Sequence, residues 1–87
     1  MRINVRGKYW TFKRVRCPDD LDGFCDWDKR RVVVSSRLTR PKDILDTTIH
    51  ELLHAAIPDL AEDAVEETAT CIADVLHRLG AEIEAGR

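Results

Sequence analysis

The stretch DTTIHELLHAAI, residues 46–57, carries the pattern from which the fold and the chemistry of this chain can be predicted. Its residue spacing predicts a helix with one apolar face and one face that carries both His50 and His54. Because these histidines are four residues apart, their imidazoles can reach one ion. Zinc favours such nitrogen ligands, and Glu51 is placed to take a proton from a water molecule on the metal. The stretch therefore predicts a catalytic zinc site; the alternative is a surface helix with two unrelated histidines.

The N-terminal half predicts a small sheet. Residues 3–15 alternate in polarity around a turn at 6–8, which is typical of a β-hairpin. Residues 17–28 are rich in Asp and contain Pro and Gly, so this segment is predicted to be an irregular loop. The valine-rich run 31–36 predicts a third strand.

The C-terminal half predicts two helices. The first should begin with Asp43 as its N-cap and run to about Ile57. The second should begin at Asp59 and end before Gly80, with residues 81–87 continuing as a frayed helix. Its predicted apolar stripe comprises Ala61, Val65, Thr68, Ile72, Leu76 and Leu79. The expected fold class is α+β, a three-stranded antiparallel or mixed sheet packed on an antiparallel pair of helices.

A zinc site of this kind needs a third protein ligand, and the second helix offers several carboxylates. His77 lies too far along that helix to meet the two histidines. The turn is centred near residue 59, so the mirror position of the second histidine falls near residue 64, and a glutamate leans toward the N-terminus of its helix. This geometry favours Glu66 as the third ligand. Glu62, one turn earlier, is the alternative, although helix capping already explains it, and Glu67 is the remaining one.

Charge is distributed unevenly along the 87 residues. Residues 1–42 hold twelve Lys and Arg against five Asp, whereas residues 43–87 hold two Arg against eleven Asp and Glu. A basic half can bind nucleic acid or an acidic partner. Because the basic residues are scattered along the predicted strands, attraction between the two halves of the chain is the favoured interpretation, and nucleic acid stays an open partner.

The remaining composition indicates the compartment. Cys17, Cys25 and Cys71 are expected to be free thiols in a reducing environment, with a Cys17–Cys25 bridge or a second metal site as the alternative. The N-terminus lacks the apolar block of a signal peptide, and no apolar run approaches a membrane span. A cytoplasmic location without a membrane partner is therefore predicted.

With two histidines on one helix and a glutamate on the next, the chain resembles the gluzincins, and in particular small zincin-like metallopeptidases encoded by phages. The resemblance rests on the runs 45–55, 58–65 and 76–80, together with 23–26 and 32–34. Zincins carry an edge strand before the active helix, to which the substrate adds as a further strand. The resemblance implies that residues 32–35 play this part, and that the chain acts in a host cytoplasm if a phage encodes it.

Matching positions imply the roles of single residues. His50 and His54 match the zinc ligands and Glu51 matches the general base. Glu66, followed four residues later by Thr70, resembles the gluzincin glutamate ligand with the residue that holds it.

The sequence thus predicts one domain over residues 1–87, a zinc metallopeptidase that hydrolyses peptide bonds through a metal-bound water activated by Glu51. Its partner would be a protein or peptide substrate. One alternative is a non-catalytic protein, stabilised by zinc, that binds a host or viral partner. The other is a SprT-like protease associated with nucleic acid.

Overall fold

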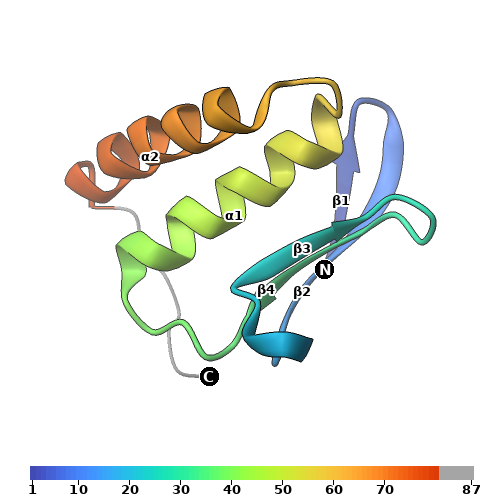
Figure 1. Ribbon diagram of the computed structural model, residues 1–87, viewed down its shortest axis with the longest axis horizontal. Coiled ribbons are helices and arrows are strands. Elements are labelled where there is room, and N and C mark those ends of the chain that lie inside the picture. The colour runs from blue at the N-terminus through green and yellow to red at the C-terminus, as the bar shows by residue number, and fades with distance from the viewer. Residues whose placement is uncertain (81–87) are drawn as a thin grey trace.

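Four strands form one mixed sheet, and two helices lie to one side of it (Figure 1). The computed structural model describes residues 1–80. The strands are β1 (Arg2–Val5), β2 (Lys8–Val15), β3 (Gly23–Asp26) and β4 (Arg31–Ser35), and the helices are α1 (Pro41–Ala56) and α2 (Glu62–Arg78). Helix α1 packs against β3, β4 and α2, so it lies between the sheet and α2. This arrangement confirms the α+β fold class.

The strand order is β1-β2-β4-β3, and it makes β4 an interior strand. β1 and β2 form the predicted antiparallel hairpin, β2 and β4 are parallel, and β3 is antiparallel to β4. The side chains of Val32, Val33 and Val34 are all buried. A continuous apolar run of this kind is typical of a strand that is covered on both faces. One edge of the sheet is therefore β1, and the other is β3.

Two predictions about the sheet were wrong. A fourth strand, Gly23–Asp26, lies inside the segment that was expected to be an irregular loop. This strand contains only two apolar residues, Phe24 and Cys25. Its pairing with β4 stabilises it, as does an ion pair of 3.3 Å between Asp26 and Arg31. The run 32–35 was expected to pair with a substrate, but both of its edges are already occupied by β2 and β3.

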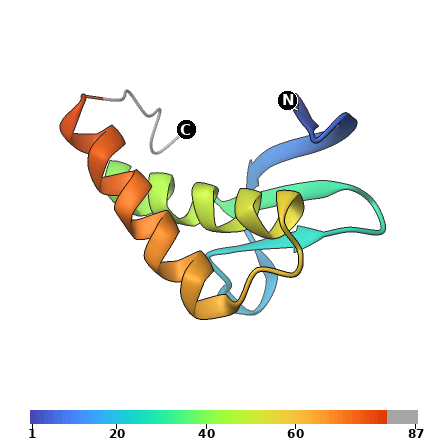
Figure 2. The same ribbon diagram turned by 90° about the horizontal axis from the view of Figure 1, so that it is seen from above.

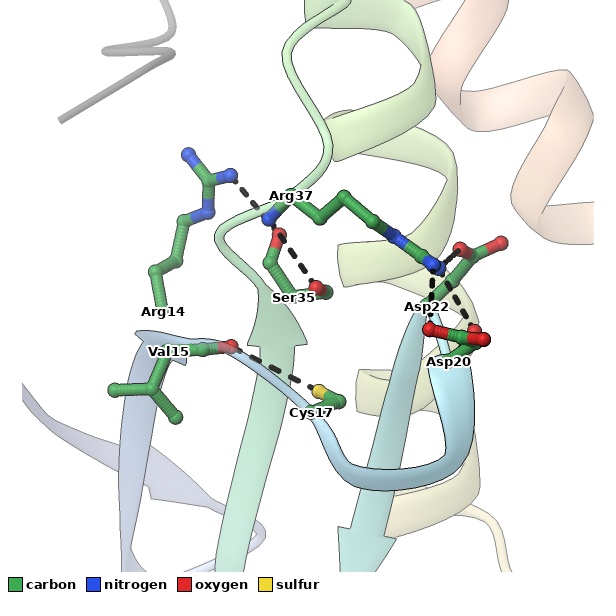
Figure 3. A network of polar contacts seen from close by, with 7 residues as sticks. All are labelled: Arg14, Val15, Cys17, Asp20, Asp22, Ser35 and Arg37. Atoms are coloured by element: carbon green, nitrogen blue, oxygen red, sulfur yellow. Dashed lines mark hydrogen bonds and ion pairs between the residues drawn. The ribbon is translucent and has the colours of Figure 1, made fainter.

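The loop before β3 is anchored to the segment that follows β4 (Figure 3). Arg37 donates hydrogen bonds to the backbone oxygen of Asp20 at 2.7 Å and to Oδ1 of Asp22 at 3.0 Å. The backbone N–H of Ser35 donates to the backbone oxygen of Asp22 at 2.7 Å. These bonds fix the entry of the edge strand β3 beside the start of α1. Within residues 1–80 all three thiols are free, so the Cys17–Cys25 bridge does not form.

Both helices begin elsewhere than predicted. Pro41 begins α1 with Arg40 at the N-cap, because proline suits the first helical position, where its missing N–H costs nothing. Asp43, the predicted cap, lies within the first turn. α2 begins at Glu62, three residues later than expected, and ends before Gly80, which takes the left-handed conformation predicted for a helix stop (φ 80°). The prediction of a frayed helix for 81–87 lies outside the described residues.

The two helices pack through small side chains. α2 buries Val65, Ala69 and Ala73, whereas Ile72 and Leu79 of the predicted stripe are exposed. Alanines allow two helix backbones to approach closely. The face of α2 that carries Ala69 and Ala73 is therefore buried, and the face with the larger apolar residues is exposed. The helices run in opposite directions in Figure 1, and Figure 2 shows that their axes cross obliquely. Within residues 1–80 no helix has the length and the apolar character that crossing a bilayer requires.

Candidate metal centre

Two histidines of α1, His50 and His54, have adjacent rings and form the first part of the candidate site. Their four-residue spacing places both rings on one helix face, with Nε2 of His50 3.2 Å from Nε2 of His54. Both side chains are largely buried, at 22% and 20% exposure. The structure therefore brings together the two residues that the sequence predicted as metal ligands.

Glu62 adds a carboxylate to this pair. Its Oε1 lies 3.1 Å from Nε2 of His50, and its Oε2 lies 3.1 Å from Nε2 of His54. Glu62 is the first residue of α2, and a helical side chain leans toward the N-terminus of its helix. The carboxylate consequently reaches back across the turn between the helices to the histidines of α1.

The separations among these donors fit a single metal ion. Each of the three residues offers a ligand atom within 4.8 Å of the others. In a tetrahedral zinc site with bonds of roughly 2.0–2.1 Å, donor atoms are about 3.3 Å apart. The observed separations of 3.1 and 3.2 Å are close to that value. Two imidazoles and one carboxylate are also a donor set that leaves a tetrahedral ion one position for water or substrate.

Glu66, the favoured third ligand from the sequence, does not lie in this group. It is exposed and borders a shallow hollow on α2 together with Glu67, Thr70 and Cys71. Thr70, its expected partner, instead donates a hydrogen bond to Asp46 at 3.1 Å.

The residue of α2 that meets the histidines lies closer to the turn than the mirror argument placed it. With the helix beginning at Glu62, position 66 is already a full turn beyond the residue that faces the histidines. The oblique helix crossing also breaks the mirror relation on which the choice of Glu66 depended. Glu62 was the alternative in the sequence, and Glu67 and His77 are both exposed.

Glu51 is a buried carboxylate directly beside the candidate metal site. It is 9% exposed, and among the described residues it has no hydrogen bond. Burial raises its pKa above the ordinary value; His50 and His54 oppose this shift, and the charge of Glu62 adds to it. A buried carboxylate that has no hydrogen-bond partner within residues 1–80 is available to exchange a proton with a water molecule or a substrate.

A hollow of about 220 Å³ gives access to Glu51 between β3 and α1. Asp22 and Gly23 border it on the sheet side, and Thr47 and His50 border it on the helix side. A second hollow, of about 400 Å³, shares Asp22 and Thr47 with the first and extends toward Leu38. The candidate metal site is therefore reached from an open cleft and not from an enclosed cavity.

Gly23 is a site residue that the sequence analysis missed. A Cβ atom at this position would lie 2.8 Å from the backbone oxygen of Val33, 2.9 Å from Cγ2 of Thr47 and 3.3 Å from Cγ of Glu51. Only glycine lets β3 pass this close to α1 at the level of Glu51. The glycine was visible in the sequence, but within an Asp-rich segment it was interpreted as part of a loop.

The chain was also compared with known proteins. Comparisons with protein families, with curated proteins and with solved structures found no match.

Proposed function

We propose that the chain is a zinc-dependent metallopeptidase of a minimal zincin type. The observation that carries this proposal is the group of His50, His54 and Glu62 with its metal-like donor separations, beside the buried carboxylate of Glu51. Two imidazoles and a carboxylate would hold the ion. Bound zinc would act as a Lewis acid that polarises a carbonyl and lowers the pKa of water.

Glu51 would move the proton in this reaction. Its carboxylate takes a proton from water as the water oxygen adds to the peptide carbonyl carbon. The same group then gives the proton to the departing amine nitrogen when the carbon–nitrogen bond breaks. Burial supports this role, because it shields the carboxylate from bulk water beside the candidate ligands. His50 and His54 would act as ligands throughout and leave proton transfer to Glu51.

The free edge of β3 offers a place for the substrate backbone. Within residues 1–80, β3 pairs with β4 on one side only, and its first residue lies against α1 at the level of Glu51. An extended peptide that adds to this edge would pass along the cleft with its backbone hydrogen-bonded to residues 23–26. This edge takes the part that the sequence analysis gave to residues 32–35. An open cleft suits a flexible segment of a protein substrate.

The test is cleavage of a peptide library by zinc-loaded protein, with Glu51→Gln as the inactive variant. We expect the variant to keep its zinc and to lose hydrolysis by roughly 100-fold or more, because a general base contributes 10²–10⁴-fold. Glu67→Gln removes an exposed carboxylate on α2 and should cleave like the wild type. Full zinc occupancy of the wild type without cleavage would contradict the proposal and leave a zinc-stabilised binding protein. Equal cleavage by Glu51→Gln would contradict the role of Glu51.

A further inference from the structure

A further hollow, of about 450 Å³, lies away from the candidate metal ligands at one end of the sheet. The β1–β2 turn, the β3–β4 turn and the C-terminal end of α1 meet there (Figure 1). Its volume is in the range of sites that accept a small molecule or one unit of a polymer. None of its lining residues is a ligand of the candidate metal centre, so its occupant is independent of that centre.

Three cations border this hollow: Arg6, Lys8 and Arg30. Among residues 1–80 no Asp or Glu lines it, and the ion pairs found in this part of the chain include none of the three cations. Arg6 uses Nη1 to donate a hydrogen bond to the last backbone oxygen of α1, that of Ala56, at 3.1 Å. Its other guanidinium N–H groups stay available. The charged residues that line the hollow are therefore all positive.

Both arginines occupy backbone positions that do not favour arginine. Arg6 has φ 51° and begins the two-residue turn that Gly7 completes at φ 87°, and Arg30 has φ 49° at the end of the β3–β4 turn. Glycine and asparagine adopt this left-handed region more readily, and they dominate such hairpin positions. The hydrogen bond to Ala56 gives Arg6 a role in the fold, whereas the side chain of Arg30 makes no hydrogen bond or ion pair within residues 1–80. Two arginines at such positions in different turns border the same hollow, which points to a ligand for their side chains.

Tryptophan provides the apolar surface of the hollow. Trp27, in the β3–β4 turn, is 47% exposed, and Trp10 lines the hollow from the core at 6% exposure. A half-exposed indole beside unpaired cations can stack on a flat ring while the cations bind phosphate. An acidic peptide would satisfy the cations but would make no use of an exposed indole. A nucleotide carries both the flat ring and the phosphate in one unit.

We propose that this hollow binds single-stranded nucleic acid, with one base against Trp27 and the adjoining phosphates on Arg6, Lys8 and Arg30. The distribution of charge agrees with this assignment. Residues 1–42, which include the sheet and its turns, carry twelve of the fourteen Lys and Arg residues, whereas Asp22, Asp43 and Asp46 line the cleft near the candidate metal site. A polyanion is thus attracted to the turn end of the sheet and repelled from the cleft. The proposal stands independently of peptidase activity.

The experiment measures fluorescence anisotropy of a labelled twelve-nucleotide oligo-dT with the full chain in a salt series that begins at about 0.1 M, where the Debye length is about 10 Å. Arg30→Gln removes a lining cation. Arg16→Gln removes the same charge beyond the other end of β2. Arg16 lies five residues past Thr11, whose N–H donates to the backbone oxygen of Arg30, so it is about 17 Å from Arg30 at roughly 3.3 Å per residue. We expect Arg30→Gln to weaken binding roughly tenfold and to reduce the salt dependence by about one phosphate contact. Arg16→Gln should retain affinity within about twofold, since charge at that distance is largely screened.

Trp27→Leu tests the stacking contact. It should weaken binding roughly tenfold without changing the charge, because base–aromatic stacking contributes on this scale. Thermal unfolding of each variant verifies that it is folded. No binding by the folded wild type, equal losses in Arg16→Gln and Arg30→Gln, or an unchanged affinity in folded Trp27→Leu would each overturn the proposal. Equally tight binding of a labelled twelve-residue polyglutamate would also overturn it, in favour of an acidic protein partner.

Discussion

The carboxylate of Glu62 lies 3.1 Å from Nε2 of His54, although the two residues belong to different helices. The turn between these helices runs from Ile57 to Ala61, and it brings the first residue of α2 opposite the last turns of α1. The position of the candidate metal site is thus fixed by where α2 begins. A change in the length of this turn would move the carboxylate away from both histidines.

Gly23 tests how closely the edge strand must approach α1. We expect Gly23→Ala to lower the free energy of unfolding by about 1–3 kcal/mol, the usual cost of adding a methyl group to a packed interface. The new Cβ would meet a backbone oxygen at 2.8 Å, which cannot move without shifting β4. Urea unfolding measures the change.

A second substitution identifies which contact matters in Gly23→Ala. Thr47→Ser removes the methyl carbon that the new Cβ would approach to 2.9 Å. Combined with Gly23→Ala, it should recover part of the lost stability but not all, because the contact with the backbone of Val33 remains. An unchanged stability of Gly23→Ala would contradict the close approach of β3 to α1.

The helix interface gives a second prediction. Ala69 is fully buried between α2 and its neighbours, so Ala69→Leu should destabilise the fold by about 1–3 kcal/mol through overpacking. Ile72 is 39% exposed on the same helix, and Ile72→Ala should cost much less than the 2–5 kcal/mol typical of a core isoleucine. Urea unfolding of both variants measures the two effects. A larger loss of stability in Ile72→Ala than in Ala69→Leu would instead support the apolar stripe that the sequence predicted, which contains Ile72 and not Ala69.

The three thiols should react at different rates with an alkylating reagent at pH 8. Burial, followed by the charges of Glu51 and Asp26, raises the pKa of Cys25 to about 11. Because the raised pKa leaves little thiolate at pH 8, Cys25 should react slowly, as should the buried Cys17. Cys71 is exposed and should give the fast phase.

Mass spectrometry of the alkylated protein assigns these phases. Cys71→Ser should remove the fast phase and leave the slow ones unchanged. Rapid labelling of Cys25 in folded protein would contradict its burial beside Glu51.

The parts of the fold that the sequence predicted are those with strong local periodicity. The hairpin of residues 2–15 alternates regularly, the valine run of β4 is buried, and the spacing of His50 and His54 is helical, and all three appear as predicted. Strand β3 was missed because its evidence is not local. Two apolar residues among aspartates give no strand signal, and pairing with β4 is what stabilises them.

The third site residue depended on how the two helices cross, which local sequence does not determine. The turn is centred near residue 59 as predicted, so the mirror position of His54 stays near residue 64, yet Glu62 is the residue that meets the histidines. The oblique crossing of the helices breaks the mirror relation that favoured Glu66. The buried face of α2 was misjudged for a related reason, because close packing against α1 favours alanine over larger apolar residues.

Zinc affinity of two matched variants tests the central claim, that His50, His54 and Glu62 form one metal site. Competition with a zinc-binding dye gives the dissociation constant for the wild type, Glu62→Ala and Glu66→Ala. Loss of an outer contact to a metal ligand already costs 10–100-fold, so loss of Glu62 itself should weaken binding by about 100-fold or more. Glu66→Ala, which removes an exposed carboxylate one turn further along, should bind zinc like the wild type. Retained affinity in Glu62→Ala with a collapse in Glu66→Ala would contradict the account.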